Sequence, residues 1–397
     1  MNTSSSVPAA GPVQGAHPAP AAGAVQGAHP NPLLGLRKLG QSVWLDDMGR
    51  AILADGSLAR LIQEDGLGGV TSNPAIFAAS MTKDPQYLQA IQQRLQTVTS
   101  SLALYESLAI EDLRAAADLF APLYQSTSRG DGFVSLEVSP HIAYDSAASI
   151  AEGKRLWAQL QRPNAMIKIP GTKAGLTAIR ELISEGININ VTLLFSPERY
   201  HEVVNAFLEG LESRVAAGKP IDHVSSVASF FLSRIDTLVD QKLDALVARG
   251  QPAAKTLRGK AALAGSARAY QIYSDIIASE RWEKLAARGV RPQRLLWAST
   301  STKDPSYSPI KYVEDLVAAD TVNTMPRQTI DAYRRLGQPE PRLERHMADA
   351  ADAREGLERL GVDLDEVAET LEREGVRKFV EPFDKLQAWL EEKRTQR

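Results

Sequence analysis

The sequence of 397 residues contains no cysteine at all. Without thiols, a protein cannot form disulfides, use a cysteine nucleophile, or bind zinc or iron–sulfur clusters through cysteine ligands. The composition is otherwise ordinary for a globular protein, with 44% hydrophobic and 23% charged residues. This length fits two or three domains, or one large α/β barrel with additional elements.

Long apolar runs are missing as well, since no stretch approaches the roughly 18–20 apolar residues that a membrane-spanning helix needs. Positive charge is not in excess either, because 45 Lys and Arg residues are balanced by 48 Asp and Glu residues, for a net charge of −3. We therefore expect no general attraction for nucleic acid or an anionic membrane, so that anions must be recognised by a few local groups. We expect a cytoplasmic protein.

Residues 1–36 contain no charged residue, and the first charge is Arg37. Ala, Pro, Gly and Ser dominate this segment, and the run Val-Gln-Gly-Ala-His-Pro occurs twice, ending at Pro18 and Pro30. Such a segment buries too little apolar surface to offset its ordering entropy. We interpret residues 1–36 as a disordered tail whose two histidines are incidental rather than metal ligands, and residues 37–397 as one catalytic domain.

From Arg37 onward, short β-rich runs alternate with longer segments of helical spacing, such as 145–160 and 173–185. Eight such alternations indicate a (β/α)₈ TIM barrel of the α/β class rather than an open sheet. No Gly-x-Gly-x-x-Gly or Gly-x-x-x-x-Gly-Lys-[Ser/Thr] motif follows a predicted strand, which argues against a nucleotide site. Extra helices are predicted after the second strand, at 86–96 and 102–124, and at the C-terminus, at about 345–397. The predicted strands are 42–47, 69–73, 132–138, 165–170, 187–194, 223–231, 294–300 and 321–325.

Several predicted strands carry polar residues where a strand buried on both faces should be apolar. The two-residue period places Asp46, Glu137 and Lys168 opposite the apolar faces of their strands. Asn188, Asn190 and Thr192 likewise share one face of the fifth strand. Because the apolar faces must meet the surrounding helices, we expect the polar faces to converge on the barrel axis, near the carboxyl ends of the strands where such barrels place their chemistry.

A structural salt-bridge network is the alternative explanation for these polar residues. An unpaired buried lysine is costly, however, and burial favours its neutral form, which is the form that attacks a carbonyl carbon. Two carboxylates, Asp46 and Glu137, are available for opposite acid and base roles. The residues alone therefore favour an aldolase that acts through a Schiff base on a hydroxylated ketone.

Several motifs resemble those of the transaldolase family, in its longer bacterial form. The resemblance extends from about Gln41 to Met325 in the same strand order, whereas the C-terminal helices match only in general character. The motifs are Ser-Val-Trp-Leu-Asp-Asp (42–47), Gly-Val-Thr-Ser-Asn-Pro-Ala-Ile-Phe (69–77), Val-Ser-Leu-Glu-Val (134–138), Ile-Lys-Ile-Pro-Gly-Thr (167–172) and Gly-Ile-Asn-Ile-Asn-Val-Thr-Leu-Leu-Phe (186–195).

This resemblance implies that the chain transfers a dihydroxyacetone unit between sugar phosphates in the non-oxidative pentose phosphate pathway. Lys168 would form the Schiff base, and Asp46 would be the general base for carbon–carbon bond cleavage. Glu137 and Thr192 would activate the water of imine formation and hydrolysis, while Asn73 and Asn190 would bind the three-carbon unit. Such a mechanism needs no metal and no diffusible cofactor, and it allows either a monomer or a homodimer.

The phosphate site is where the sequence departs from the family. The resemblance places Ser229 and Arg234 at the phosphate, since a hydroxyl and a forked guanidinium suit a dianion; a helix-surface cation is the alternative for Arg234. Compact members of the family have a phosphate-binding Arg after the seventh strand, but Trp297–Lys303 contains none. Ser301 or Lys303 is expected to substitute, and Arg327 after the eighth strand is a further candidate.

Two other functions are compatible with the same residues. One is a fructose 6-phosphate aldolase, which would release free dihydroxyacetone without an acceptor. The other is a non-catalytic barrel that binds sugar phosphates. The extra helices and Glu137 argue against the aldolase, because the short aldolases resemble a more compact barrel. A transferase must also protect its enamine from water, and the C-terminal helices are candidates for a lid.

Overall fold

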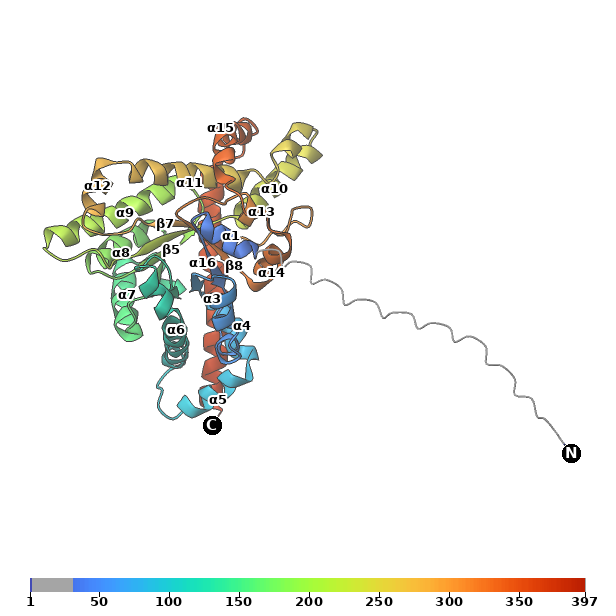
Figure 1. The fold of residues 1–397 in the computed structure, drawn as a ribbon. Coiled ribbons are helices and arrows are strands. Elements are labelled where there is room, and N and C mark those ends of the chain that lie inside the picture. The colour runs from blue at the N-terminus through green and yellow to red at the C-terminus, as the bar shows by residue number, and fades with distance from the viewer. Residues whose placement is uncertain (2–30, 397) are drawn as a thin grey trace. The chain divides into compact units, whose positions relative to one another are not determined.

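Eight parallel strands close into a barrel in sequence order, β1 to β8, in the computed structural model (Figure 1). The structure describes Met1 and residues 31–396. The predicted (β/α)₈ architecture is confirmed. The strands are β1 (Gln41–Asp46), β2 (Gly69–Thr71), β3 (Phe133–Glu137), β4 (Ala165–Pro170), β5 (Ile189–Leu194), β6 (Ser226–Phe231), β7 (Arg294–Ala298) and β8 (Thr321–Met325).

Helices connect the strands, and the predicted extra helices are present after β2 and at the C-terminus. The first half of the chain contains α1 (Pro32–Lys38), α2 (Arg50–Ala54), α3 (Ser57–Glu64), α4 (Pro74–Lys83), α5 (Pro85–Arg94), α6 (Ser101–Ser126), η1 (Pro140–Ile142), α7 (Ser146–Leu160), α8 (Lys173–Ser184) and α9 (Pro197–Ala216). The second half contains α10 (Ser233–Ala248), η2 (Pro252–Leu257), α11 (Ala261–Ile277), α12 (Glu280–Ala286), α13 (Lys311–Glu314), α14 (Arg327–Leu336), α15 (Leu343–Arg359) and α16 (Leu364–Thr395). No helix among the described residues is both long and apolar enough to cross a membrane.

The predicted tail boundary at residue 36 is wrong, because α1 begins at Pro32. The Asn31 side chain accepts a hydrogen bond from the Leu33 amide at 3.0 Å and so caps this helix. Leu33 and Leu36 are fully buried, so the end of the uncharged segment belongs to the folded body. The rest of the predicted tail, with both repeats, lies outside the described residues.

The β4–α8 unit illustrates how the sequence specifies the barrel. Buried Ile167 and Ile169 alternate with Lys168 along β4, so the strand presents its apolar face to the helices and its lysine to the axis. Thr172 then caps α8 by accepting a hydrogen bond from the Gly175 amide at 3.0 Å. The helix buries Ile179, Leu182 and Ile183, which recur at helical spacing.

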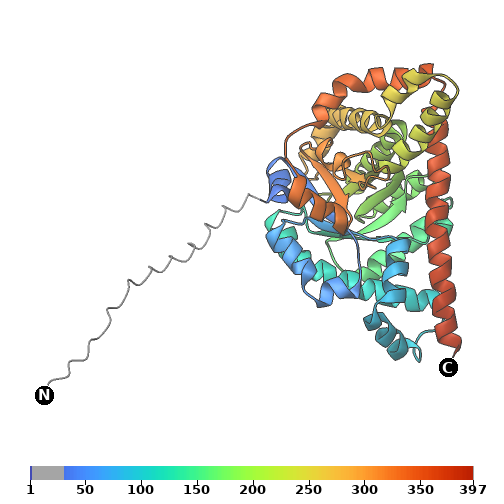
Figure 2. The same ribbon diagram turned by 90° about the vertical axis from the view of Figure 1, so that its right-hand side faces the viewer.

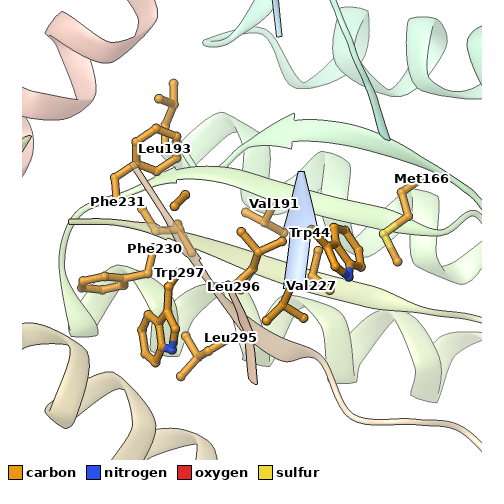
Figure 3. Close-up of a cluster of buried hydrophobic side chains, with 14 of the residues drawn as sticks. Trp44, Met166, Val191, Leu193, Val227, Phe230, Phe231, Leu295, Leu296 and Trp297 are labelled. Carbon is orange, nitrogen blue, oxygen red and sulfur yellow. The ribbon is translucent and has the colours of Figure 1, made fainter. Parts of the chain in front are cut away.

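Large apolar side chains fill the barrel and the space beneath its helices. Figure 3 shows this cluster, in which Trp44 from β1 and Trp297 from β7 are both fully buried. Gly69 of β2 leaves room for the Trp44 ring, since a Cβ atom there would lie 2.7 Å from two of its atoms. The interior is thus a packed core, and barrels of this type place their chemistry at the carboxyl ends of the strands.

The C-terminal helix α16 docks on the barrel body beside the strands. It packs against α4, α6, α10, η1 and the end of β5, and Figure 2 shows it as a long red helix along one side. Its buried residues recur on one face, and they include Phe379, Phe383 and Leu386. The last helix of the chain thereby packs against elements that follow strands early in the sequence, such as α4 after β2 and η1 after β3.

Gly175 is the glycine whose replacement should disturb this body most directly. A Cβ atom there would lie 1.9 Å from the backbone oxygen of Pro170, so Gly175→Ala must displace the loop between Lys168 and α8. We expect a loss of about 1–3 kcal/mol in the free energy of unfolding, as for other overpacked sites. Thermal unfolding followed by circular dichroism measures the change.

Gly265→Ala provides the matched control. A Cβ atom at Gly265, inside α11, has Phe230 as its nearest neighbour at 3.5 Å, which is ordinary contact. Because alanine is the better helix former, the melting temperature of this variant should be unchanged or raised. Equal melting temperatures for Gly175→Ala and wild type would contradict the predicted clash.

Candidate active site

Lys168 lies inside the barrel and is 4% exposed. The strand register pairs it with Glu137 of β3 on one side and Asn190 of β5 on the other. Its Nζ atom donates a hydrogen bond to the backbone oxygen of Ser72 at 3.1 Å and lies 3.3 Å from Glu137 Oε2. The structure therefore brings the predicted lysine and one predicted carboxylate into direct contact.

The Glu137 carboxyl is almost as deeply buried, at 7% exposure. Burial raises its pKa, the positive charge of Lys168 opposes that shift, and the charge of Asp46 adds to it. Within the described part of the chain, Oε2 is in ion-pair range of Lys168 but accepts no hydrogen bond. This oxygen can therefore accept a proton from the amine or a hydrogen bond from a water molecule.

Asp46 ends β1 and is held by two hydroxyl groups that the sequence analysis did not identify. Thr71 donates a hydrogen bond to Asp46 Oδ1 at 2.8 Å, and the Thr71 and Thr324 hydroxyl oxygens are 2.8 Å apart. Since Thr71 uses its proton on Asp46, Thr324 is the donor in the second bond. The chain of hydroxyls fixes the carboxylate at the mouth of the barrel.

A second chain of hydrogen bonds holds Asn190. Ser229 donates to Asn190 Oδ1 at 2.8 Å, and Asn190 Nδ2 donates to the Ser135 hydroxyl at 3.0 Å. Ser229 thus lies beside the residue predicted to bind the three-carbon unit. The predicted partner of Ser229 at the phosphate, Arg234, is the second residue of the next helix, α10.

Thr192 is fully buried, and its hydroxyl has no hydrogen-bond partner among the described residues. The next residue, Leu193, has a φ of +62°, and the pairing of β5 with β6 is irregular between Val191 and Leu194. The strand alternation predicted for 187–194 is interrupted at this point, because a leucine with positive φ leaves the regular pleat. Asn188 lies before β5 and has a structural role, because its Nδ2 atom donates hydrogen bonds to the backbone oxygens of Pro163 and Ala165.

Arg234 lies half-buried at the mouth of the barrel rather than on the outer surface of α10. Its guanidinium carbon is 5.2 Å from the centre of the Phe231 ring and 5.9 Å from that of Phe379. Burial lowers its pKa, and the charges of Asp46 and Glu137 oppose this shift. Within the described residues, its buried Nη1 group has no hydrogen-bond partner, so a donor remains available to an anion.

Two other predicted site residues form hydrogen bonds within the protein. Asn73 caps α4, where its Oδ1 accepts a hydrogen bond from the Ile76 amide at 3.0 Å. Lys303 is exposed and donates to the Ser301 hydroxyl at 2.8 Å. Lys303 also shares a pocket with several aspartates, among them Asp240 and Asp304. The same pocket holds Arg258, which pairs with Asp304 at 2.7 Å, so cations and carboxylates are mixed there.

The remaining candidate, Arg327, is the first residue of α14, and its positive charge acts to lower the pKa of Asp47 and Asp55.

In the described part of the chain, no group of three or more His, Asp or Glu side chains is arranged to hold a metal ion.

Comparison with known proteins agrees with this geometry. A family model described as "Transaldolase/Fructose-6-phosphate aldolase" matches residues 43–390. The chain belongs to this family.

Individual members of the family resemble the chain over nearly all of its folded part. It is 44% identical over 369 residues to "Transaldolase 2" of Nostoc sp., covering 91% of this chain and 97% of that protein. It is 44% identical over 351 residues to "Transaldolase" of Thiobacillus denitrificans, covering 88% of this chain and 97% of the relative. For "Transaldolase" of Thermobifida fusca the identity is 45% over 355 residues, covering 88% and 95% of the two chains.

The environment of Glu137 leads to a direct test of the site's electrostatics. Removing the nearby positive charge with Lys168→Met should raise the pKa of the Glu137 carboxyl further, because the charge of Lys168 stabilises the carboxylate. The carboxyl stretch can be followed against pH by infrared spectroscopy with ¹³C-labelled glutamate, and the loss of a band in Glu137→Gln assigns it. Lys173→Met, at an exposed lysine of α8, should leave the band unchanged. A lowered or constant pKa in Lys168→Met would contradict the assigned contact.

Proposed function

We propose that the protein is a transaldolase that moves a dihydroxyacetone unit from a ketose phosphate to an aldose phosphate through a Schiff base on Lys168. One observation carries the proposal, namely a buried lysine amine 3.3 Å from a buried carboxyl inside a barrel. The names of the relatives support the same reaction. The donors we propose are sedoheptulose 7-phosphate or fructose 6-phosphate, and the acceptors are glyceraldehyde 3-phosphate or erythrose 4-phosphate, which places the enzyme in the non-oxidative pentose phosphate pathway.

In the first stage, the neutral amine of Lys168 attacks the ketone carbon. Glu137 suits the role of proton acceptor, because its carboxyl lies 3.3 Å from the amine and burial raises its pKa. The carbinolamine then loses its hydroxyl as water when an acid protonates it, leaving an iminium ion. Glu137 Oε2 and the Thr192 hydroxyl form no hydrogen bond with the described residues. They offer two groups to hold that water, which returns when the product is hydrolysed.

In the second stage, Asp46 removes the proton from the hydroxyl group next to the bond that breaks. The O–H electrons form the carbonyl of the departing aldose phosphate, and the electrons of the broken carbon–carbon bond move into the iminium to give an enamine. Thr71 orients the Asp46 carboxylate by its 2.8 Å hydrogen bond. Addition of the acceptor aldehyde reverses these steps, and Asp46 returns the proton to the new hydroxyl.

The substrate is held by polar groups on either side of the lysine. Asn190 and Asn73 would bind the hydroxyls of the three-carbon unit. Arg234 would bind the phosphate with its unpaired donor, assisted by Ser229, because a guanidinium forks onto two phosphate oxygens. Phosphate contacts from Ser301 and Lys303 stay predictions, as does a cytoplasmic location for either a monomer or a homodimer.

A fructose 6-phosphate aldolase is the alternative activity, since the family description includes both. The two activities share the enamine and differ in what consumes it. Transaldolase passes it to an aldehyde, whereas the aldolase protonates and hydrolyses it. Residues of α6 line a pocket together with Glu137, and the long α16 packs against β5. These two helices cover the site more fully than a compact barrel would, which favours transfer.

An acceptor test distinguishes these activities. Wild-type protein incubated with fructose 6-phosphate should turn over only when erythrose 4-phosphate is present, and sedoheptulose 7-phosphate should form. Lys168→Met should lose at least about 1,000-fold in rate, because the electrophilic activation comes from the amine itself. Coupled assays for glyceraldehyde 3-phosphate and dihydroxyacetone follow both reactions. Equal turnover with and without the acceptor would refute the transferase assignment.

A separate prediction concerns Asp46. Asp46→Asn should retain Schiff-base formation, measured as substrate trapped by borohydride, yet lose at least about 100-fold in turnover, as expected for a missing general base. Asp47→Asn replaces the neighbouring carboxylate and should affect turnover much less. A parallel loss of trapping and turnover in Asp46→Asn would exclude the assigned role.

A further inference from the structure

Helix α16 places an aromatic ring over the amine of the candidate active site. The centre of the Phe379 ring lies 5.7 Å from Lys168 Nζ and 5.9 Å from the guanidinium carbon of Arg234. Phe379 is 4% exposed, so its ring is enclosed within the protein. It comes from the last helix of the chain, far in sequence from the eight strands that supply the polar groups.

The Phe379 ring lies near both groups that would hold a bound ketose phosphate. This step rests on the proposed function, in which Lys168 binds the ketone carbon and Arg234 binds the phosphate. A ring close to both cations lies over the space between them, where the carbon chain of the substrate would extend. Asn190 is the register partner of Lys168 on β5, and Thr192 follows it two residues along the same strand.

The packing of α16 fixes the ring at this place. One turn before Phe379, Gly375 allows close approach, because a Cβ atom there would lie 2.9 Å from Leu193 Cδ2 and 3.5 Å from Arg234 Nη1. One turn after it, Phe383 packs against Tyr105, with ring centres 5.5 Å apart. The helix is thus anchored on both sides of Phe379, and the ring is held rather than free to swing out.

We propose that Phe379 is a specificity-determining residue that keeps water from the enamine and so favours transfer over hydrolysis. Hydrolysis needs a proton on the enamine carbon, then addition of water to the iminium carbon. The C–N bond next breaks to give dihydroxyacetone and the neutral amine, and the proton that the water gives up balances the one consumed. Release of the transferred ketose needs the same attack of water on an iminium carbon, so the two routes differ only in whether the enamine carbon takes a proton or the acceptor. An apolar ring over the amine offers no hydrogen bond to a water molecule that could deliver that proton. The acceptor aldehyde, by contrast, has a carbon chain that can pack against the face of the Phe379 ring.

The ratio of two products tests this proposal. With fructose 6-phosphate and saturating erythrose 4-phosphate, we would measure free dihydroxyacetone released per molecule of sedoheptulose 7-phosphate formed. Phe379→Ala should raise this ratio about tenfold, which corresponds to a barrier to water lowered by about 1.4 kcal/mol. In D₂O the extra dihydroxyacetone should carry one deuterium on carbon, detected by mass spectrometry, because solvent protonates the enamine. Both products come from one enamine, so a loss of folded protein cancels from the ratio.

Trp389→Ala is the matched control, since it removes an aromatic ring from the same helix, α16, at a position that packs beside Lys393 instead of the site. Its ratio should equal that of wild type. An unchanged ratio in Phe379→Ala, or an equal rise in Trp389→Ala, would overturn the proposal. If Phe379→Ala does not fold, Phe379→Leu decides, and it should give a smaller rise of the same sign. Absence of transfer by the wild-type protein would instead refute the proposed function.

Discussion

The structure depends on one buried contact, that between the Lys168 amine and the Glu137 carboxyl, 3.3 Å apart. Two groups that water would stabilise are both enclosed, so each makes the burial of the other tolerable. Their meeting follows from barrel register, which pairs the two residues across β3 and β4. The carboxyl therefore lies where the proposed carbonyl chemistry needs a proton acceptor.

The surrounding elements control what reaches this contact. Hydroxyl groups of Thr71 and Thr324 orient Asp46 from β1, while α16 covers the amine with the ring of Phe379. Because charges act more strongly where water is excluded, the same enclosure that shifts the pKa of Glu137 also strengthens the interaction of Arg234 with an anion. A site of this kind is built by the whole barrel, since its groups come from strands, loops and the last helix.

The alternation of eight strand-like runs with helical segments was sufficient to predict the barrel. Two-residue periodicity selected Asp46, Glu137 and Lys168, because a polar residue inside a doubly buried strand conflicts with packing. Periodicity could not reveal Phe379, since an apolar residue on a helix has the same pattern whether it faces a core or a reacting atom. It also could not predict the positive φ of Leu193, which depends on tertiary packing at the end of β5. The start of α1 at Pro32 was not predicted, because the residues before Arg37 are uncharged and rich in proline. The capped helix is stabilised by Leu33 and Leu36, whose burial in the folded body the local sequence does not show.

The most direct measurement is peptide mapping of the wild-type protein after borohydride reduction in the presence of fructose 6-phosphate. The account predicts a single modified peptide in which Lys168 carries a reduced three-carbon unit, because that unit remains after the aldose phosphate departs. An adduct on another lysine, or none with a protein that still turns over substrate, would contradict a mechanism centred on the amine beside Glu137.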